Sequence, residues 1–345
     1  MRGLLIVNMH ATTTSPRVTD VLVHALAGEI DLEVARTERR GHARELAERA
    51  QRERLDLLCT LGGDGTINEA VNGLLANGPD SDVPDLVTVP GGSANVIPRS
   101  LGLSADPVEA TGEILEALRE GRRRRISVGK ATATDAGGVV CAPQWFVANA
   151  GMGIDAEIIA AMEEQRSAGR EATPSRYLRT TIRQFFAGTD RRHPALTVQS
   201  TPGEPVMSGG EDGAVSGEPS EVDASDASLP GQIDGVFLAI VQNTAPWTYL
   251  GTKAINPCPQ ASYDTGLDLF AVRRLGVPAA LRLARRMIAG SEAGSTKRSL
   301  TVLHDQDRIE VQADPATRLQ IDGEGFAPMT RVVLEYVPNA LGVIC

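Results

Sequence analysis

The chain has 345 residues, of which 42% are hydrophobic, 3% aromatic and 23% charged. This length suits two domains of common size, with cores built from Leu, Val, Ile and Ala. The formal net charge is −10, but residues 201–231 contribute seven acids and no base, so the remainder is close to neutral and carries no nucleic-acid footprint.

The first residues and the cysteines indicate the compartment. The apolar run in MRGLLIVNMH is only about five residues long, too short for a signal sequence or a membrane span. The four cysteines have no CxxC pair and no His at a metal-binding spacing, so they are expected to be free thiols: Cys59, Cys141, Cys258 and Cys345. We therefore expect a cytoplasmic protein without a disulfide framework.

Residues 3–120 alternate between strand-like and helical patterns. The expected strands are 4–8, 31–37, 55–61 and 86–90, and the expected helices are 17–28, 41–54, 66–75 and 106–121. This alternation predicts an α/β fold with a doubly wound parallel sheet covered by helices.

The pattern of the sequence changes after the basic run 122–125. Short strand-like pieces dominate, with helical stretches near 155–165, 175–188 and 278–289, which predicts a β-rich (sandwich) second domain. Segment 201–231, rich in Gly, Ser, Pro and acid, is expected to be a disordered insertion between two strands. The predicted division is 1–127 for the α/β domain, joined again by 326–345, and 128–325 for the β-rich domain.

Two glycine loops directly follow two consecutive predicted strands, LGGDGT at 61–66 and PGGSAN at 90–95. In parallel sheets, ligands bind at the carboxyl ends of the strands, so the two loops are expected to form one site. Gly62, Gly63 and Gly65 would let backbone N–H groups approach phosphate oxygens, beside the positive end of the helix that begins near Thr66.

Asp64 poses a problem of sign, because a carboxylate repels a phosphate. If a nucleotide binds here, Asp64 must hold Mg²⁺ or face a hydroxyl or an amide. The alternative is a tight turn, followed by a capping box between Thr66 and Glu69. A Walker A loop is absent, because Gly129-Lys130 is followed by Ala131.

Four motifs together resemble the diacylglycerol kinase catalytic-domain family, which includes bacterial lipid kinases and sphingosine kinases. They are GGDGTINEAVNGL, VPGGSANVIPRSLGL, FVANAGMGIDAEI and IDGEGF. The resemblance implies an ATP- and Mg²⁺-dependent kinase of phospholipid metabolism that phosphorylates the hydroxyl of diacylglycerol or a related lipid alcohol. It also implies an active site between a nucleotide-binding α/β domain and a β-rich lipid domain.

The resemblance also assigns roles to individual residues. Glu324 corresponds to the general base, and Asp64 to a carboxylate that acts on the catalytic Mg²⁺. Nucleotide contacts are implied at Asn8, Thr37, Gly62, Gly63, Asp64, Gly65, Thr66, Asn68, Gly92, Ser93 and Asn95.

The sequence departs from the family pattern at two places. After Asn8 it reads Met-His-Ala-Thr-Thr-Thr where the family often has Pro and glycines, so hydroxyls would replace backbone donors. Thr265 stands where a metal-binding Asp would follow Asp264, so the sequence does not support a second, structural metal near Asp264.

A lipid kinase without a membrane span must visit the bilayer surface. Two predicted helices carry recurrent arginines that would suit transient contact with an anionic membrane, unless they are simply solvated faces: Arg176, Arg179 and Arg183, and Arg282, Arg285 and Arg286. Two other functions remain open, a kinase of a soluble acceptor resembling NAD kinase and a non-catalytic nucleotide-binding protein. The patterns indicate no oligomeric state.

Overall fold

The computed structural model describes residues 1–8, 15–80, 82–153, 194–202, 231–273 and 299–345. The helices predicted near 155–165, 175–188 and 278–289, with the arginines assigned to membrane contact, lie outside these residues. The same holds for most of the acidic insertion and for residues 9–14 of the first loop.

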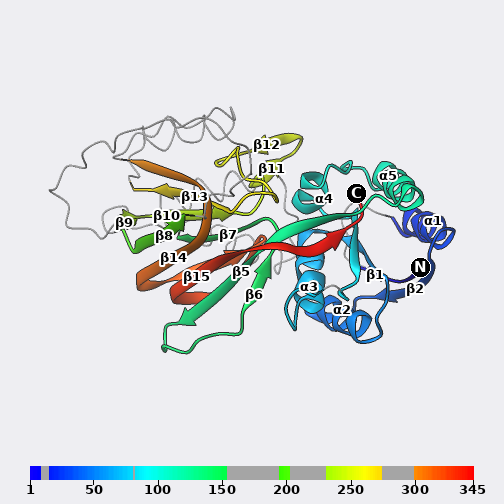
Figure 1. Cartoon of the computed structure of the whole chain (residues 1–345), viewed down its shortest axis with the longest axis horizontal. Coiled ribbons are helices and arrows are strands. Elements are labelled where there is room, and N and C mark those ends of the chain that lie inside the picture. The colour runs from blue at the N-terminus through cyan, green and yellow to red at the C-terminus, as the bar shows by residue number, and fades with distance from the viewer. Residues whose placement is uncertain (9–14, 81, 154–193, 203–230, 274–298) are drawn as a thin grey trace, which may run out of the picture.

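The N-terminal part is an α/β unit (Figure 1). Its four parallel strands lie in the order β4-β3-β1-β2, with bounds β1 Arg2–Val7, β2 Asp31–Arg36, β3 Leu57–Gly62 and β4 Asp85–Pro90. The helices of this part are α1 Pro16–Ala27, α2 His42–Arg52, α3 Asp64–Leu74, α4 Val96–Ser100 and α5 Pro107–Glu120. The predicted alternation and the parallel sheet are confirmed.

Alternate residues of β1 point to opposite faces of the sheet. Leu4 and Ile6 pack into a core with α2 and α3, whereas Leu5 and Val7 pack into a second core with α1 and α5. Because both faces are covered, the parallel strands are continuous apolar runs and not alternating ones. Such a sheet leaves its carboxyl edge as the natural place for polar loops.

The second part is β-rich, as predicted. Its strands are antiparallel to one another and connect with the parallel strands into one branched sheet: β5 Arg124–Asp135, β6 Gln144–Phe146, β7 Asn149–Gly153, β8 Leu196–Pro202, β9 Gln232–Val236, β10 Leu238–Gln242, β13 Leu267–Val272, β14 Leu300–Ile321 and β15 Glu324–Val343. Strands β11 Thr248–Leu250 and β12 Lys253–Ile255 form a separate pair.

The last strand connects the two parts. β15 begins in the β-rich part and ends in the α/β part, where Val343 pairs in parallel with Leu86 and the Ile344 N–H donates to the Leu86 carbonyl (3.1 Å). Figure 1 shows both chain ends on the α/β side. β8 and β9 are antiparallel neighbours, so the two ends of the acidic segment between them lie together; Thr201 and Pro202 still belong to β8.

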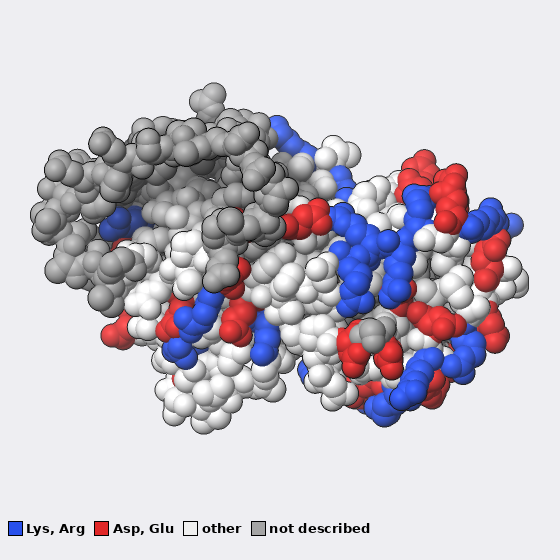
Figure 2. Space-filling view, in the orientation of Figure 1, with Lys and Arg blue, Asp and Glu red and all other residues white. Residues whose placement is uncertain are grey.

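Charges of both signs are interspersed over the α/β part, whereas the lower end of the β-rich part is largely uncharged in this view (Figure 2). The basic run is balanced by nearby acids: Arg122 pairs with Glu120, Arg123 with Asp85 and Arg124 with Asp264, at 2.8, 2.7 and 2.7 Å. Among the described helices, none is both long enough and apolar enough to cross a bilayer.

A close helix crossing provides a test of this packing. Gly73 of α3 is buried against α2, and a Cβ there would collide with the Arg44 carbonyl oxygen and lie 2.7 Å from the Ala47 Cβ. We expect Gly73→Ala to lower the unfolding free energy by about 1–3 kcal/mol in urea titrations, because overpacking outweighs the gain in helix propensity. Gly112→Ala in α5 is the control. Nothing lies within 4 Å of that Cβ, so a gain of about 0.5–1 kcal/mol is expected. Equal effects of the two variants would contradict the tight crossing.

Candidate active site

The two glycine loops touch each other backbone to backbone. β3 and β4 are parallel neighbours whose register ends at Gly62 and Pro90, and the Gly91 N–H donates to the Gly62 carbonyl at 2.8 Å. A Cβ on Gly92 would lie 2.6 Å from the Gly63 Cα. Only glycine permits this approach, so the loops predicted to form one site are in direct contact at the carboxyl edge of the sheet.

Asp64 is the first residue of α3, and its carboxylate connects the two loops. One oxygen accepts the Val96 N–H at 3.0 Å and the other accepts the Ile97 N–H at 2.9 Å, which fixes the start of α4. Burial raises the pKa of the Asp64 carboxyl, and the two backbone N–H groups oppose that shift. Of the alternatives that the sequence left open for Asp64, the structure shows a carboxylate that faces two backbone amides.

Polar residues that follow β1 and β2 lie at the same carboxyl edge of the sheet. The Asn8 side-chain amide donates to the Thr66 hydroxyl at 2.8 Å, and the Thr37 N–H donates to the Val7 carbonyl at 3.0 Å. In the second loop, the Asn95 side-chain oxygen accepts the Gly92 N–H at 2.8 Å. Ser93 is exposed beside them. Apart from Asn68, whose side chain is buried and bonds to Trp145 and Asp322, the residues assigned to the nucleotide thus lie around one edge, and their individual contacts stay predictions.

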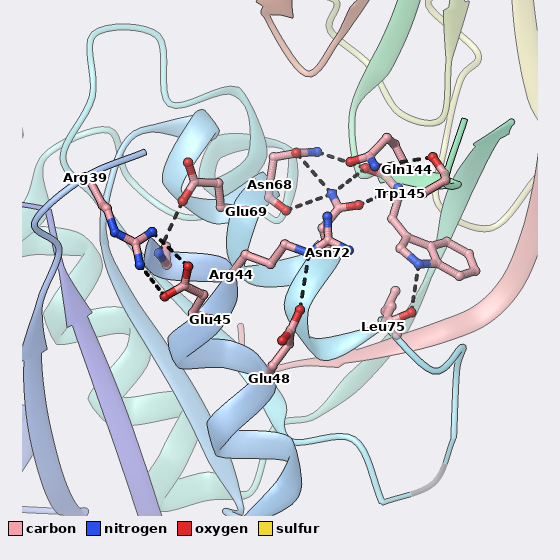
Figure 3. A network of polar contacts seen from close by, with 12 residues as sticks. Arg39, Arg44, Glu45, Glu48, Asn68, Glu69, Asn72, Leu75, Gln144 and Trp145 are labelled. Atoms are coloured by element: carbon pink, nitrogen blue, oxygen red, sulfur yellow. Dashed lines mark hydrogen bonds and ion pairs between the residues drawn. The ribbon is translucent and has the colours of Figure 1, made fainter. Parts of the chain in front are cut away.

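The predicted capping box is wrong. α3 begins at Asp64, not near Thr66, and its N-cap residue Gly63 makes no side-chain cap. The Glu69 carboxylate instead accepts the N–H groups of Gly41 (2.8 Å) and Ala43 (3.2 Å), so it caps the neighbouring helix α2 (Figure 3). The reason is tertiary: α2 has a glycine N-cap and no side-chain acceptor of its own.

Two amides on α3 reach into the β-rich part (Figure 3). Asn68 and Asn72 are 5% and 3% exposed, and both side chains donate to the Trp145 carbonyl at 2.9 Å. The Trp145 N–H donates back to the Asn72 side-chain oxygen at 2.8 Å, and its indole N–H donates to the Leu75 carbonyl at 2.8 Å. Helix α3 is therefore bonded along its length to the start of β6.

Glu324 lies against the first glycine loop, although 259 positions separate it from Gly65 in the sequence. A Cβ on Gly65 would be 2.9 Å from one Glu324 carboxylate oxygen, and the other oxygen pairs with the Arg40 guanidinium at 3.1 Å. The Glu324 side chain is 22% exposed and that of Arg40 is 64% exposed. The Glu324 carboxylate, which can accept a proton, is thus held between the first glycine loop and the exposed Arg40 guanidinium.

The donor set suits a magnesium ion shared with a substrate. Mg²⁺ usually takes one or two protein carboxylates and completes its shell with water and phosphate oxygens. Asp64 offers one carboxylate beside the loops, with lone pairs left after its two backbone bonds. The described residues contain no group of three or more His, Cys, Asp or Glu placed to bind a metal by themselves.

Asp264 lies elsewhere, in a turn before β13. Its side chain is 69% exposed and its carboxylate pairs with Arg124. The Thr265 hydroxyl donates to the Ser262 carbonyl at 3.2 Å. These local bonds account for the turn.

The architecture has close counterparts among solved structures. A diacylglycerol kinase from Bacillus anthracis str. Sterne superposes with a TM-score of 0.65 over 99% of this chain and 96% of its own, at 19% identity. Yeast NADH kinase complexed with NADH superposes with a TM-score of 0.51 over 99% and 82%, at 10% identity. At these identities the likeness concerns the fold, which is the two-part α/β and β-rich fold common to both.

Sequence comparison is more specific than the fold. Residues 2–131 match the family model of the diacylglycerol kinase catalytic domain. A curated relative, the diacylglycerol kinase of Staphylococcus aureus (strain JH9), is 39% identical over 94 residues, which cover 27% of this chain and 28% of the relative. The resemblance to this family is therefore confirmed, with the family model covering residues 2–131, which contain the first two of the four motifs.

Sequence reasoning missed several residues that shape this site. Asn72 could have been found from the sequence, since its spacing of four from Asn68 puts both amides on one helix face. Arg40 and Asp322 carried little signal, because their partners are distant in the sequence: Arg40 contacts Glu324, and Asp322 accepts a hydrogen bond from Asn68 at 2.8 Å.

The bond between α3 and the start of α2 provides a test of the site's frame. We expect Glu69→Ala to lower the unfolding free energy by about 1–2 kcal/mol in urea titrations, because the Gly41 and Ala43 N–H groups lose their acceptor. Glu48→Ala is the matched control. It removes an i,i+4 pair with Arg44 on α2, for which about 0.3–0.5 kcal/mol is expected. A loss at Glu69 no larger than that at Glu48 would show that the cap is energetically idle.

Proposed function

We propose that this protein is an ATP- and Mg²⁺-dependent lipid kinase that phosphorylates the hydroxyl of diacylglycerol or a related lipid alcohol. The main support is the position of Glu324, whose carboxylate packs on Gly65 of the first glycine loop. Phosphoryl transfer to an alcohol needs a positioned phosphate and an acceptor for one proton, and this contact brings the two together. The family match over residues 2–131 adds support for the kinase class.

In this proposal the substrate hydroxyl binds beside the Glu324 carboxylate at the glycine loops. Its oxygen forms a bond to the γ-phosphorus of ATP while the bond to the bridging β,γ-oxygen breaks, and its proton passes to the Glu324 carboxylate. Backbone N–H groups of Gly62, Gly63 and Gly65 bind phosphate oxygens at the start of α3. Arg40, which pairs with Glu324, holds that carboxylate over the loop.

Mg²⁺, when bound, would neutralise charge on the phosphates, and Asp64 is the residue proposed to hold it. Asn8, Thr37 and Thr66 surround the same edge and are proposed to orient the nucleotide, with Gly92, Ser93 and Asn95 on the second loop. The proposed division of labour places the nucleotide on 1–127 with the end of β15, and the lipid on the β-rich part within 128–325. Peripheral contact with an anionic membrane is proposed for delivery of the lipid, and equal sedimentation with neutral and anionic vesicles would contradict it.

The direct test is transfer of labelled γ-phosphate from ATP, with Mg²⁺, to acceptors offered one at a time. Diacylglycerol and a sphingoid base are presented in mixed micelles, and NAD in solution. We expect an organic-soluble labelled product from a lipid acceptor. Label found only in a soluble acceptor would replace the proposal by a kinase of that acceptor, and no transfer to any acceptor would favour a nucleotide-binding protein.

The role of Glu324 is tested with an isosteric variant. We expect Glu324→Gln to lower kcat by about 10²–10⁴-fold, because the amide cannot take the proton of the hydroxyl. Stability should change little, since the lost ion pair involves an exposed arginine. Glu335→Gln is the control, because Glu335 lies on the same strand but away from the loops. Its kcat should stay within about twofold of the wild-type value. A Glu324→Gln enzyme with near-normal kcat would remove Glu324 as the base.

A further inference from the structure

Asp322 is a buried carboxylate that gathers four N–H donors. One oxygen accepts the Asn68 side-chain amide and the Val147 N–H, both at 2.8 Å. The other accepts the N–H groups of Ala148 and Asn149, both at 2.9 Å. Asp322 is 7% exposed, so water cannot substitute freely for these bonds.

These bonds join three parts of the fold. Asn68 belongs to α3, which begins at the first glycine loop. Val147, Ala148 and Asn149 lie where β6 passes into β7, and Asp322 lies in the turn between β14 and β15. We call Asp322 and its four N–H donors the Asp322 node. This node fixes α3, which begins at the first glycine loop, against the β14–β15 hairpin that carries Glu324.

The hairpin turn is only two residues long. Asp322 and Gly323 both have positive φ, 45° and 81°, and Ile321 pairs with Glu324 on either side of them. Glu324 is thus the first residue of β15, two positions from the Asp322 carboxylate. A shift of this turn relative to α3 would carry the Glu324 carboxylate away from Gly65.

A simpler explanation is that Asp322 is present only for the turn. Two-residue hairpin turns with positive φ favour Asp-Gly and Asn-Gly alike. That preference explains the backbone angles, but it requires no side-chain acceptor for four donors. Surrounding bonds also stiffen the turn: the Asp322 N–H donates to the Asn149 carbonyl (2.8 Å), and the Gly323 N–H donates to the Gln320 side-chain oxygen (3.0 Å). The two explanations differ in whether asparagine can replace aspartate.

We propose that Asp322 is a positioning residue. Through its bond with Asn68, it holds the turn before Glu324 at a fixed place relative to α3, the helix that begins at the first glycine loop. The proposal rests on the proposed kinase function and deepens it. Asp322 takes no proton from the substrate and touches no reacting atom. It sets the distance between the proton acceptor and the loop that binds the transferred phosphate, and misplacement of about 1 Å there is enough to cost about 10²-fold in rate.

The test is Asp322→Asn, which keeps the turn preference and the side-chain shape. Its amide nitrogen would face N–H donors, so at least one bond of the node is lost. We expect kcat to fall by about 10- to 100-fold while the KM for ATP stays within about twofold, because the turn that Asp322 holds carries no proposed nucleotide contact. Asn68→Ala, which removes one donor and leaves the three backbone bonds, should lower kcat in the same manner.

A second measurement does not depend on activity. Hydrogen exchange of at least one of the amides 147–149 should speed up by about tenfold or more in Asp322→Asn, since the N–H groups that face the new amide nitrogen lose their acceptor. Asp135→Asn is the matched control. Its carboxylate also holds a hairpin turn, through the N–H groups of Gly137 and Val139 at 2.8 Å, but far along β5 from the loops. It should leave kcat and the exchange of 147–149 unchanged.

The outcomes separate the two proposals. If the wild-type enzyme transfers phosphate and Asp322→Asn retains kcat within about twofold with unchanged exchange at 147–149, Asp322 serves the turn alone and the inference is overturned. A kcat loss accompanied by an equal rise in the KM for ATP would also overturn it, in favour of a nucleotide contact. If the wild-type protein transfers no phosphate, the kinase proposal fails, and the exchange experiment still tests whether the node holds the turn.

Discussion

The structure of this site depends on direct backbone contact between two glycine loops. β3 and β4 end side by side, the Gly91 N–H bonds to the Gly62 carbonyl, and no side chain fits between Gly63 and Gly92. This contact leaves the loop N–H groups at the carboxyl edge of a sheet whose faces are both covered by helices. It also brings Asp64 within reach of the start of α4, where its carboxylate bonds to two N–H groups. The remaining polar residues of the site are arranged around this pair of loops.

Helix α3 transmits the position of the loops to the β-rich part. Most of its residues are buried, including Asn68 and Asn72, which bond to the backbone of Trp145. Buried polar groups are costly unless every donor and acceptor is paired, so such a network favours one relative placement of its elements. Burial raises the pKa of the Asp322 carboxyl, while its four N–H donors favour the charged form. The placement of Glu324 over Gly65 is a consequence of this paired interior.

Local patterns predicted the α/β part well, because the features that define it are local. Leu4 to Val7 read as a buried strand, as the structure has them, and the Gly-rich runs at 61–66 and 90–95 do lie at the ends of two strands. The capping box failed for the opposite reason. Thr66 and Glu69 have the right spacing, but α3 begins earlier and Glu69 finds two unpaired N–H groups on α2. Spacing alone does not indicate which helix an acidic side chain will cap.

The sequence by itself determined the alternation of strands and helices, the two glycine loops and their common edge, and the family that the motifs resemble. Periodicity and glycine content act over a few residues, so they can be read without the fold. Only the tertiary structure decided the partners of the polar side chains. Asn68 and Asp322 are 254 positions apart, and Arg40 and Glu324 are 284 apart. Which donors meet which acceptors depends on the groups that folding removes from water together, and no local pattern contains that information.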